Sequence, residues 1–523
     1  TIEVVNLGMT AVNTYTVRDF ARECLSYQPD ALIIYSGHNE FYGALGTGSS
    51  QRPFWGSNRS LTLAYIALKK TRLFQLWTHL EDWFRQRHPG RAPTQTLMAR
   101  MAREQTIPLD SPLVEKTARI FQQNLEDICH WTREAGIPLF LGTLVSNLKD
   151  QPPFVSIPPP GRTEPELDRD IRRRLEGRSQ VQEKSLLDSL KRIYPGYARV
   201  YYAAGKVEEQ LGDWSAAREA YRQARDLDGL RFRAPTRFNE ILTTLAETEP
   251  QVFLVPVEAR FAHASPHGLI GQELIWEHLH PNLKGYFLMA AAFGQALETW
   301  FPHSRTVPED SLFRSIAVTG LDSALARYRI QILTAGWPFH PEHRFLTAAD
   351  LQAGTVEDSL AIAVLTHDSD YEKAHVSLAQ TYLRRGQWQR AAREYRVLAT
   401  TFPYSESPWL ALGHILVDHR RFREALPVLE TVLTLTPDAF AAKWAGAIRL
   451  QQGDPGRALG LLQQAERLNP RDPQVLYNLS GAYFLSGDTT RALTTVERAL
   501  DLAPHDPAAK AFHRKLKAAL SQP

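Results

Sequence analysis

The sequence predicts a chain in two parts, an α/β domain built on a parallel sheet and an all-α repeat array. Two observations predict the sheet. Short apolar runs alternate with helical segments, and these runs are continuously apolar, as in strands that are covered on both faces. A third observation predicts the array, because small residues and prolines recur every 33 or 34 residues through the second half of the chain.

Length and composition set the limits of this interpretation. At roughly 150 residues per domain, 523 residues predict about three structural units. The hydrophobic share of 43% and the charged share of 22% exclude collagen-like and wholly disordered chains. Sixty basic residues against 57 acidic ones give a net charge of +3, which is too even for a dedicated nucleic-acid binder. Two cysteines exclude a disulfide scaffold, and no apolar run reaches the ~18 residues of a transmembrane helix.

The elements of the α/β domain follow from four apolar runs. We expect strands at residues 4–7, 31–35, 139–143 and 251–257, and helices between and after them, at residues 17–27, 113–135 and 285–300. The chain then divides as follows: residues 1–162 form the first part of the α/β domain, 163–249 a helical insert, 250–304 its last strand and helix, 305–367 a helical linker, and 368–523 the repeat array.

The periodicity of the array is that of tetratricopeptide repeats. A set of small residues and a set of prolines recur with the same spacing. In this pattern the small residues lie in the second helix of each pair and the prolines lie at the end of that helix. The two sets are Ala391, Ala425, Ala458 and Ala492, and Pro403, Pro437, Pro470 and Pro504. A fifth unit, at residues 201–228, falls inside the helical insert. Such arrays present a concave surface that predicts a protein or peptide partner, and exposed arginines favour an acidic one.

Three polar segments follow predicted strands. Gly8 comes after the first strand, Gly37, His38 and Asn39 come after the second, and residues 277–282 come after the last. Because the carboxyl ends of parallel strands meet at one edge of a sheet, we expect these segments to converge. They supply hydrogen-bond donors, an imidazole and a carboxylate, which are the groups that acyl transfer needs.

These segments resemble the conserved blocks of the SGNH (GDSL-type) hydrolase family, over about residues 1–155 and 250–304. The resemblance implies a flavodoxin-like parallel sheet and cleavage of an ester. It also implies that Gly8 and Asn39 form the oxyanion hole, that His280 is the catalytic base, and that Glu277 orients His280 in the place of the family's usual aspartate. Taken singly, Gly8 also fits a tight turn, Asn39 an Asx-turn and His280 an ordinary loop.

The nucleophilic serine of that family is not found in this chain. The family places it upstream of the asparagine–glycine segment, and no Gly-x-Ser-x-Gly motif is present. We therefore expect the serine, its strand and a membrane tether or signal to precede Thr1, and this fragment to be inactive alone. Residues 61–88 are aromatic and basic. They fit a helical pair packed on the domain, a cover over the cleft, or a segment that rests on a membrane surface.

The sequence thus predicts a bacterial serine ester hydrolase acting on an acyl or acetyl ester, with a repeat array for protein binding. We expect an extracytoplasmic or membrane-anchored enzyme, with the cytoplasm left open, and no cofactor, metal or nucleic acid. Two alternatives use the same residues differently. One is a non-catalytic scaffold that works through its repeats, and the other is an O-acetyltransferase that acts on a glycan.

Overall fold

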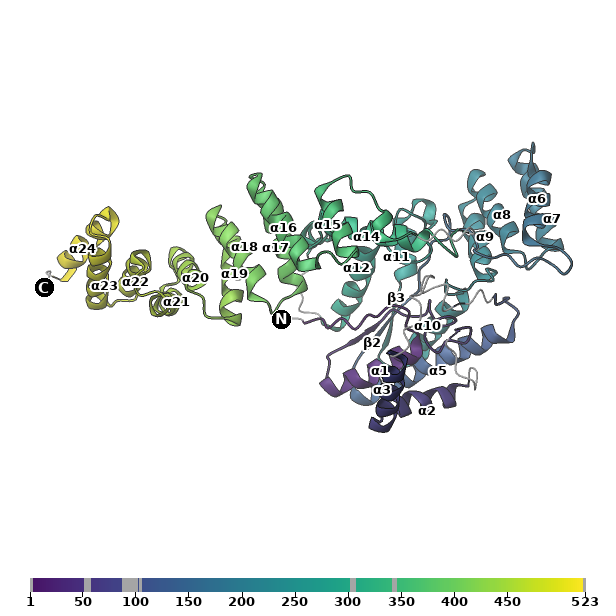
Figure 1. The fold of residues 1–523 in the computed structure, drawn as a ribbon, viewed down its shortest axis with the longest axis horizontal. Helices are drawn as coiled ribbons and strands as arrows, with labels where there is room; N and C mark the ends of the chain where they lie inside the picture. The colour runs from purple at the N-terminus through teal and green to yellow at the C-terminus, as the bar shows by residue number, and fades with distance from the viewer. Residues whose placement is uncertain are drawn as a thin grey trace. The chain divides into compact units, whose positions relative to one another are not determined.

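A computed structural model describes residues 3–50, 58–86, 102, 106–301, 307–340 and 346–520, without the side chains of residues 80–86 (Figure 1). The chain divides into two compact units. The first comprises Thr1–Arg314 and Ile330–Leu346, and the second comprises Ser315–Arg329 and Thr347–Pro523. Among the described residues, no helix has both the length and the apolarity needed to cross a membrane.

The first unit contains a parallel sheet of three strands in the order β1-β2-β3. They are β1 (Leu32–Ile34), β2 (Leu139–Gly142) and β3 (Val252–Val255), and in register Leu32 lies beside Leu139, which lies beside Val252. Three of the four predicted strands are therefore confirmed. Most of the chain is helical, so the sheet is a small part of the molecule.

Helices cover both faces of this sheet, as Figure 1 shows for the first unit. Leu139 and Leu141 share a core with α5 (Pro112–Ala135) and α10 (Thr236–Thr248), and α1 (Thr14–Cys24) packs on α5. Phe140 points to the opposite face, where α11 (Val257–Ala264) and α12 (Leu283–Trp300) close a second core. This alternation about β2 is the period-two pattern of a strand that is buried on both sides.

The fourth predicted strand, at residues 4–7, is wrong. This segment pairs with no described strand, and Val4 and Val5 are 79% and 72% exposed. An apolar run predicts burial only where a neighbouring strand offers backbone partners. The sheet edge at β1 lacks such a partner among the described residues, and Ile33 of β1 is exposed there.

The basic, aromatic segment at residues 61–88 begins as two helices, α2 (Arg59–Lys69) and α3 (Arg72–Gln86). The first is anchored, because Arg59 donates to Asn124 and pairs with Asp127 of α5. On α3, however, Leu73 and Trp77 are 81% and 68% exposed. The side chains of Leu80, Trp83, Phe84 and Arg85, and all of residues 87 and 88, lie outside the described residues.

The insert between β2 and β3 consists of paired helices. They are α6 (Glu164–Leu175), α7 (Gln180–Ile193), α8 (Ala198–Gln210) and α9 (Trp214–Asp226), which precede α10. A separate core formed by Leu167, Leu187, Val200 and their neighbours holds these helices together.

The second unit is a succession of antiparallel helix pairs. Its helices after the segment that joins the two units are α15 (Val356–Leu365), α16 (Tyr371–Arg384), α17 (Trp388–Thr401), α18 (Glu406–Asp418), α19 (Phe422–Leu435), α20 (Ala439–Gln451), α21 (Pro455–Leu468), α22 (Pro473–Leu485), α23 (Thr489–Leu502) and α24 (Pro507–Leu520). In the joining segment lie α13 (Glu309–Ser315) and α14 (Gly320–Thr334), and Leu321 and Leu325 of α14 belong to the array core.

Short 3-10 turns complete the fold at Leu25–Tyr27, Pro266–Gly268 and Ala348–Asp350. The small residues that the period singled out, Ala391, Ala425, Ala458 and Ala492, are all fully buried. Each packs where the second helix of a pair meets its neighbours, so the core positions predicted for the array are confirmed.

Candidate functional site

The loop that carries Glu277 and His280 is fixed at both ends. The His280 carbonyl accepts the Trp276 N–H at 2.8 Å, and the Leu274 carbonyl accepts the Asn282 N–H at 2.8 Å. The Asn282 side chain then caps α12 by accepting the Gly285 N–H at 3.0 Å. A loop pinned in this way holds its side chains in one arrangement, as a binding or catalytic site requires.

Glu277 is the centre of the loop. It is 5% exposed, and its carboxylate accepts hydrogen bonds from Nδ1 of both His278 and His280 and from the backbone N–H of Leu279 and His280, the latter two at 3.2 and 3.0 Å. Burial alone raises the pKa of a carboxyl. The two imidazoles outweigh it and hold the pKa of Glu277 well below its ordinary range.

The two imidazoles have different surroundings. The His278 side chain is 2% exposed and packs against Phe154 and Phe339, each with a ring-centre distance of 5.4 Å. Burial lowers the pKa of His278 although Glu277 acts against that shift. The His280 side chain is 46% exposed. With Nδ1 bound to Glu277, Nε2 of His280 remains for a ligand or a proton, which is the arrangement of a carboxylate-oriented base.

The segment after β1 lies beside this loop. His38 is buried, and its Nδ1 accepts the Ala234 N–H at 3.1 Å, so the proton of the neutral ring is on Nε2. Burial lowers the pKa of His38 to about 3, and the nearby charges of His278, Arg225 and His280 act in the same direction. Nε2 of His38 has no hydrogen-bond partner among the described residues. A buried donor left unpaired costs roughly 1–3 kcal/mol, so this one favours a ligand that accepts a hydrogen bond.

The start of α1 is joined to the same segment through Glu40. Glu40 is 3% exposed and accepts hydrogen bonds from the N–H and the hydroxyl of Thr14 at 2.8 and 2.7 Å. Burial raises the pKa of Glu40 to about 7, against the effect of Thr14. Gly37 has a φ of 157°, which L side chains rarely adopt, and a Cβ there would meet the Leu144 side chain.

The predicted site residues are therefore brought together only in part. Glu277 and His280 form the expected carboxylate–imidazole pair, and Asn39 is half-buried between His38 and Glu40. Gly8 is elsewhere. Its N–H donates to the Asn6 side chain at 2.9 Å in an exposed segment, and a Cβ on Gly8 would have only Asn6 within 4 Å among the described residues. The oxyanion role expected of Gly8 thus has no counterpart in this geometry and stays a prediction.

The same loop offers the donor set of a metal site. The ligand atoms of Glu277, His278 and His280 all lie within 4.8 Å of one another, and two imidazoles with one carboxylate are suitable ligands for several divalent transition metals. In the structure, however, both Nδ1 atoms bond to the carboxylate itself. An ion would have to replace these two bonds, so the arrangement fits the oriented base better.

Sequence reasoning gave no individual role to three residues of this region. His38, Glu40 and Ser146 are buried, and the hydroxyl of Ser146 has no partner among the described residues. The partners of His38 and Glu40 are 196 and 26 residues away in sequence, so a local pattern could not reveal them.

Comparison with known proteins identifies the repeats. Models of the tetratricopeptide repeat match residues 449–516, 410–448 and 198–229, the last within the insert of the first unit. The predicted repeats within residues 410–516 and the predicted fifth unit are thereby confirmed.

The similar proteins share only a part of the chain. Cellulose synthase operon protein C of Escherichia coli (strain K12) is 41% identical over 71 residues, which is 14% of this chain and 6% of that protein. The CTR9 homolog of Arabidopsis thaliana is 28% identical over 147 residues, 27% of this chain and 13% of that protein. The chain thus spans a small fraction of the length of these relatives.

Solved structures show the same partial likeness. A MamA double mutant has a TM-score of 0.28 and 23% identity, and covers 29% of this chain and 87% of its own. YrrB, described as a tetratricopeptide protein with an unusual peptide-binding site, has a TM-score of 0.27 and 21% identity, with coverage of 30% and 84%. In sum, the chain carries tetratricopeptide repeats in both of its units.

Proposed function

We propose that the chain is a protein-binding scaffold whose second unit captures a peptide segment of a partner. The observation that carries this proposal is the run of repeats matched at residues 410–516. Stacked helix pairs of this type bury their small residues and expose a long surface. Because the exposed residues do not hold the stack together, they can differ according to the partner that is bound.

The experiment is a selection of random peptides on the full chain, followed by mapping of the selected peptide. We expect enrichment of a sequence motif and binding that involves α16 to α24. Selection that yields no motif, or a peptide that binds only the first unit, would contradict the proposal.

A second function is favoured by one specific observation in the first unit. The Glu277–His280 pair forms beside the segment that carries His38 and Asn39. We infer an ester hydrolase site of the SGNH type, with a flavodoxin-like sheet, in which Nε2 of His280 takes a proton from a hydroxyl nucleophile and Asn39 donates to the oxyanion. Transfer of the acyl group to a glycan hydroxyl would use the same pair.

This second function is tested on the full-length protein. In p-nitrophenyl acetate hydrolysis, His280→Gln and Asn39→Ala should each lower kcat/KM about 10²-fold or more, with an unchanged melting temperature. A loss under threefold in either variant removes that residue from the role. The chain itself should not react with a fluorophosphonate probe, and a labelled serine would show that the nucleophile lies within it.

A further inference from the structure

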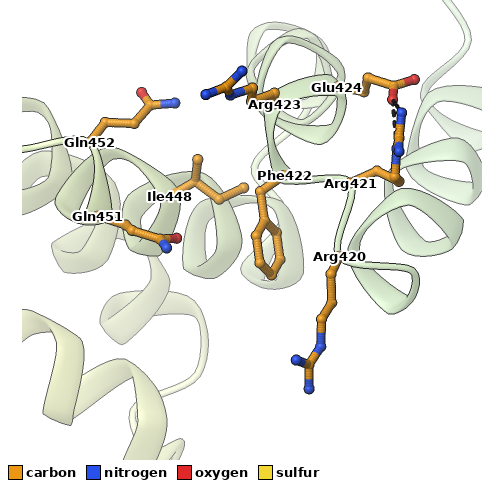
Figure 2. Close-up of a pocket in the computed structure, with 8 residues that line it drawn as sticks. All are labelled: Arg420, Arg421, Phe422, Arg423, Glu424, Ile448, Gln451 and Gln452. Carbon is orange, nitrogen blue, oxygen red and sulfur yellow. Dashed lines mark hydrogen bonds and ion pairs between the residues drawn. The ribbon is translucent and has the colours of Figure 1, made fainter.

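A hollow of about 650 Å³ lies in the second unit. It is formed by the turn between α18 and α19 and by the end of α20, so it spans two successive helix pairs. Its lining residues are Arg420, Arg421, Phe422, Arg423, Glu424, Ile448, Gln451 and Gln452 (Figure 2).

The charge of this hollow is unbalanced. Arg421 pairs with Glu424 at 2.6 Å, and Glu424 also receives Arg396 at 3.6 Å, so the one carboxylate is already shared. The side chains of Arg420 and Arg423 are exposed and form no ion pair or hydrogen bond with any residue described between 346 and 520. Two uncompensated guanidiniums therefore face a ligand that enters here, and guanidinium prefers a carboxylate or a phosphate.

The floor of the hollow is apolar and firm. Phe422 is half-buried and stacks on Trp444 with a ring-centre distance of 6.0 Å, and Ile448 is 3% exposed. Figure 2 shows Arg420 and Arg423 extending to opposite sides of the Phe422 ring, with Gln451 and Gln452 on the side of Ile448. The exposed carboxamides offer both donors and acceptors to a peptide backbone.

The backbone of Arg420 sets this turn apart from its equivalents. The corresponding turns of the other pairs have Gly386, Gly453 and Gly487, with φ of 69°, 78° and 86°. Arg420 takes the same left-handed conformation, with φ of 56°, although an L side chain pays a steric cost there. The residues after these glycines also differ, since Asp454 and Asp488 begin the next helix where Arg421 stands here. The arginine cluster therefore departs from the repeat pattern at a cost to local stability.

From these observations we propose that the hollow binds an acidic peptide in which one apolar side chain is flanked on both sides by carboxylates. The apolar side chain rests on Phe422 and Ile448, the flanking carboxylates pair with Arg420 and Arg423, and Gln451 and Gln452 bond to the peptide backbone. This inference rests on the proposed scaffold function and names the chemistry of its partner.

The test uses three fluorescein-labelled nine-residue peptides and fluorescence anisotropy on the full chain at low salt. The probe has one leucine between two aspartate–glutamate pairs. In one control peptide lysines replace the four acidic residues, and in the other serine replaces the leucine. We expect the probe to bind at least tenfold more tightly than the lysine peptide and at least threefold more tightly than the serine peptide, with weaker binding as salt rises.

The decisive variant is Arg420→Gly, which restores the residue of the sister turns. It should weaken probe binding at least fivefold while the melting temperature stays the same or rises, so lost binding cannot be attributed to unfolding. Arg423→Gln should weaken binding to a similar degree. The matched control is Arg467→Gln, because Arg467 is an exposed and unpaired arginine on α21, within the described array, and it should bind as the parent does.

Three results would overturn this inference: equal binding of the acidic and lysine peptides, no binding of the probe, or parental affinity in both arginine variants. Each is distinct from failure of the scaffold proposal. If a peptide selected from a random library binds the array and is unaffected by Arg420→Gly and Arg423→Gln, the scaffold function stands and this hollow is not its site.

Discussion

His38 is a titratable residue whose protonation state the fold dictates. The Ala234 N–H occupies Nδ1, and burial keeps the ring neutral. The pKa of about 3 in the folded protein lies below the value of about 6.5 for a free histidine. The folded chain therefore binds fewer protons than the unfolded chain between these values, and the free energy of unfolding falls as the pH drops below about 6.5.

We predict that His38→Gln removes much of this acid sensitivity. Glutamine can accept the Ala234 N–H through Oε1 but does not titrate. Between pH 7 and pH 5 the parent should lose roughly 2 kcal/mol more unfolding free energy than the variant. Urea denaturation at the two pH values measures this difference. His130→Gln, at an exposed histidine, is the control and should follow the parent, while identical pH dependence of His38→Gln and the parent would show that His38 is not buried in the neutral state.

At the scale of single residues, local motifs were sufficient for some of the site and insufficient for the rest. Glu277 and His280 are three positions apart, so a short pattern places them correctly and the structure joins them. His38 draws its properties from Ala234, far along the chain. Gly8 was assigned from a turn after a predicted strand, and the exposed position of that segment left the assignment without support. A sequence pattern predicts which residues lie close together along the chain. It does not predict the contacts that tertiary folding makes between distant residues.

The helix pair α8–α9 shows how tightly one repeat unit is packed. A Cβ on Gly205 of α8 would lie 2.6 Å from the ring of Tyr221 on α9. That ring is 1% exposed and its hydroxyl donates to Glu209 at 2.7 Å, so it has little room to move. Glycine is therefore required at this crossing because of the close approach of the two helices.

We predict that Gly205→Val destabilises this pair by about 1–3 kcal/mol, since the added side chain forces Tyr221 out of its site. Amide hydrogen exchange within α8 and α9 measures the loss as faster exchange. Gly460→Ala is the matched change in α21, where nothing lies within 4 Å of the new Cβ, and it should slow exchange there by about 0.5–1 kcal/mol. Unaltered exchange in Gly205→Val would mean that the α8–α9 contact is looser than described.

Among whole elements, the repeat helices and the sheet strands differ in how far the sequence predicts them. A repeat helix buries the face that carries its small residues against the next helix pair. The 33- or 34-residue period therefore predicts both the helix and the helices that it packs against. An apolar run such as residues 4–7 indicates only that a strand is favoured. It does not predict which strand would pair with it. This is why the repeats agree with the prediction and the first strand does not.

At the scale of the whole molecule, the candidate sites lie in two separate units. The first carries the carboxylate–imidazole cluster and a repeat-like insert, and the second carries the run of repeats and the arginine-lined hollow. Each unit has its own buried cores, so a variant in one should leave the other folded. Binding to the array can therefore be measured separately from any chemistry in the first unit.

The most direct test of the scaffold claim is hydrogen exchange of the full chain with and without a peptide selected on it. We predict slower exchange in segments of α16 to α24 when the peptide is bound, and unchanged exchange around Glu277 and His280. Protection confined to the first unit, or no protection anywhere at saturating peptide, would contradict the claim that the repeats are the binding surface.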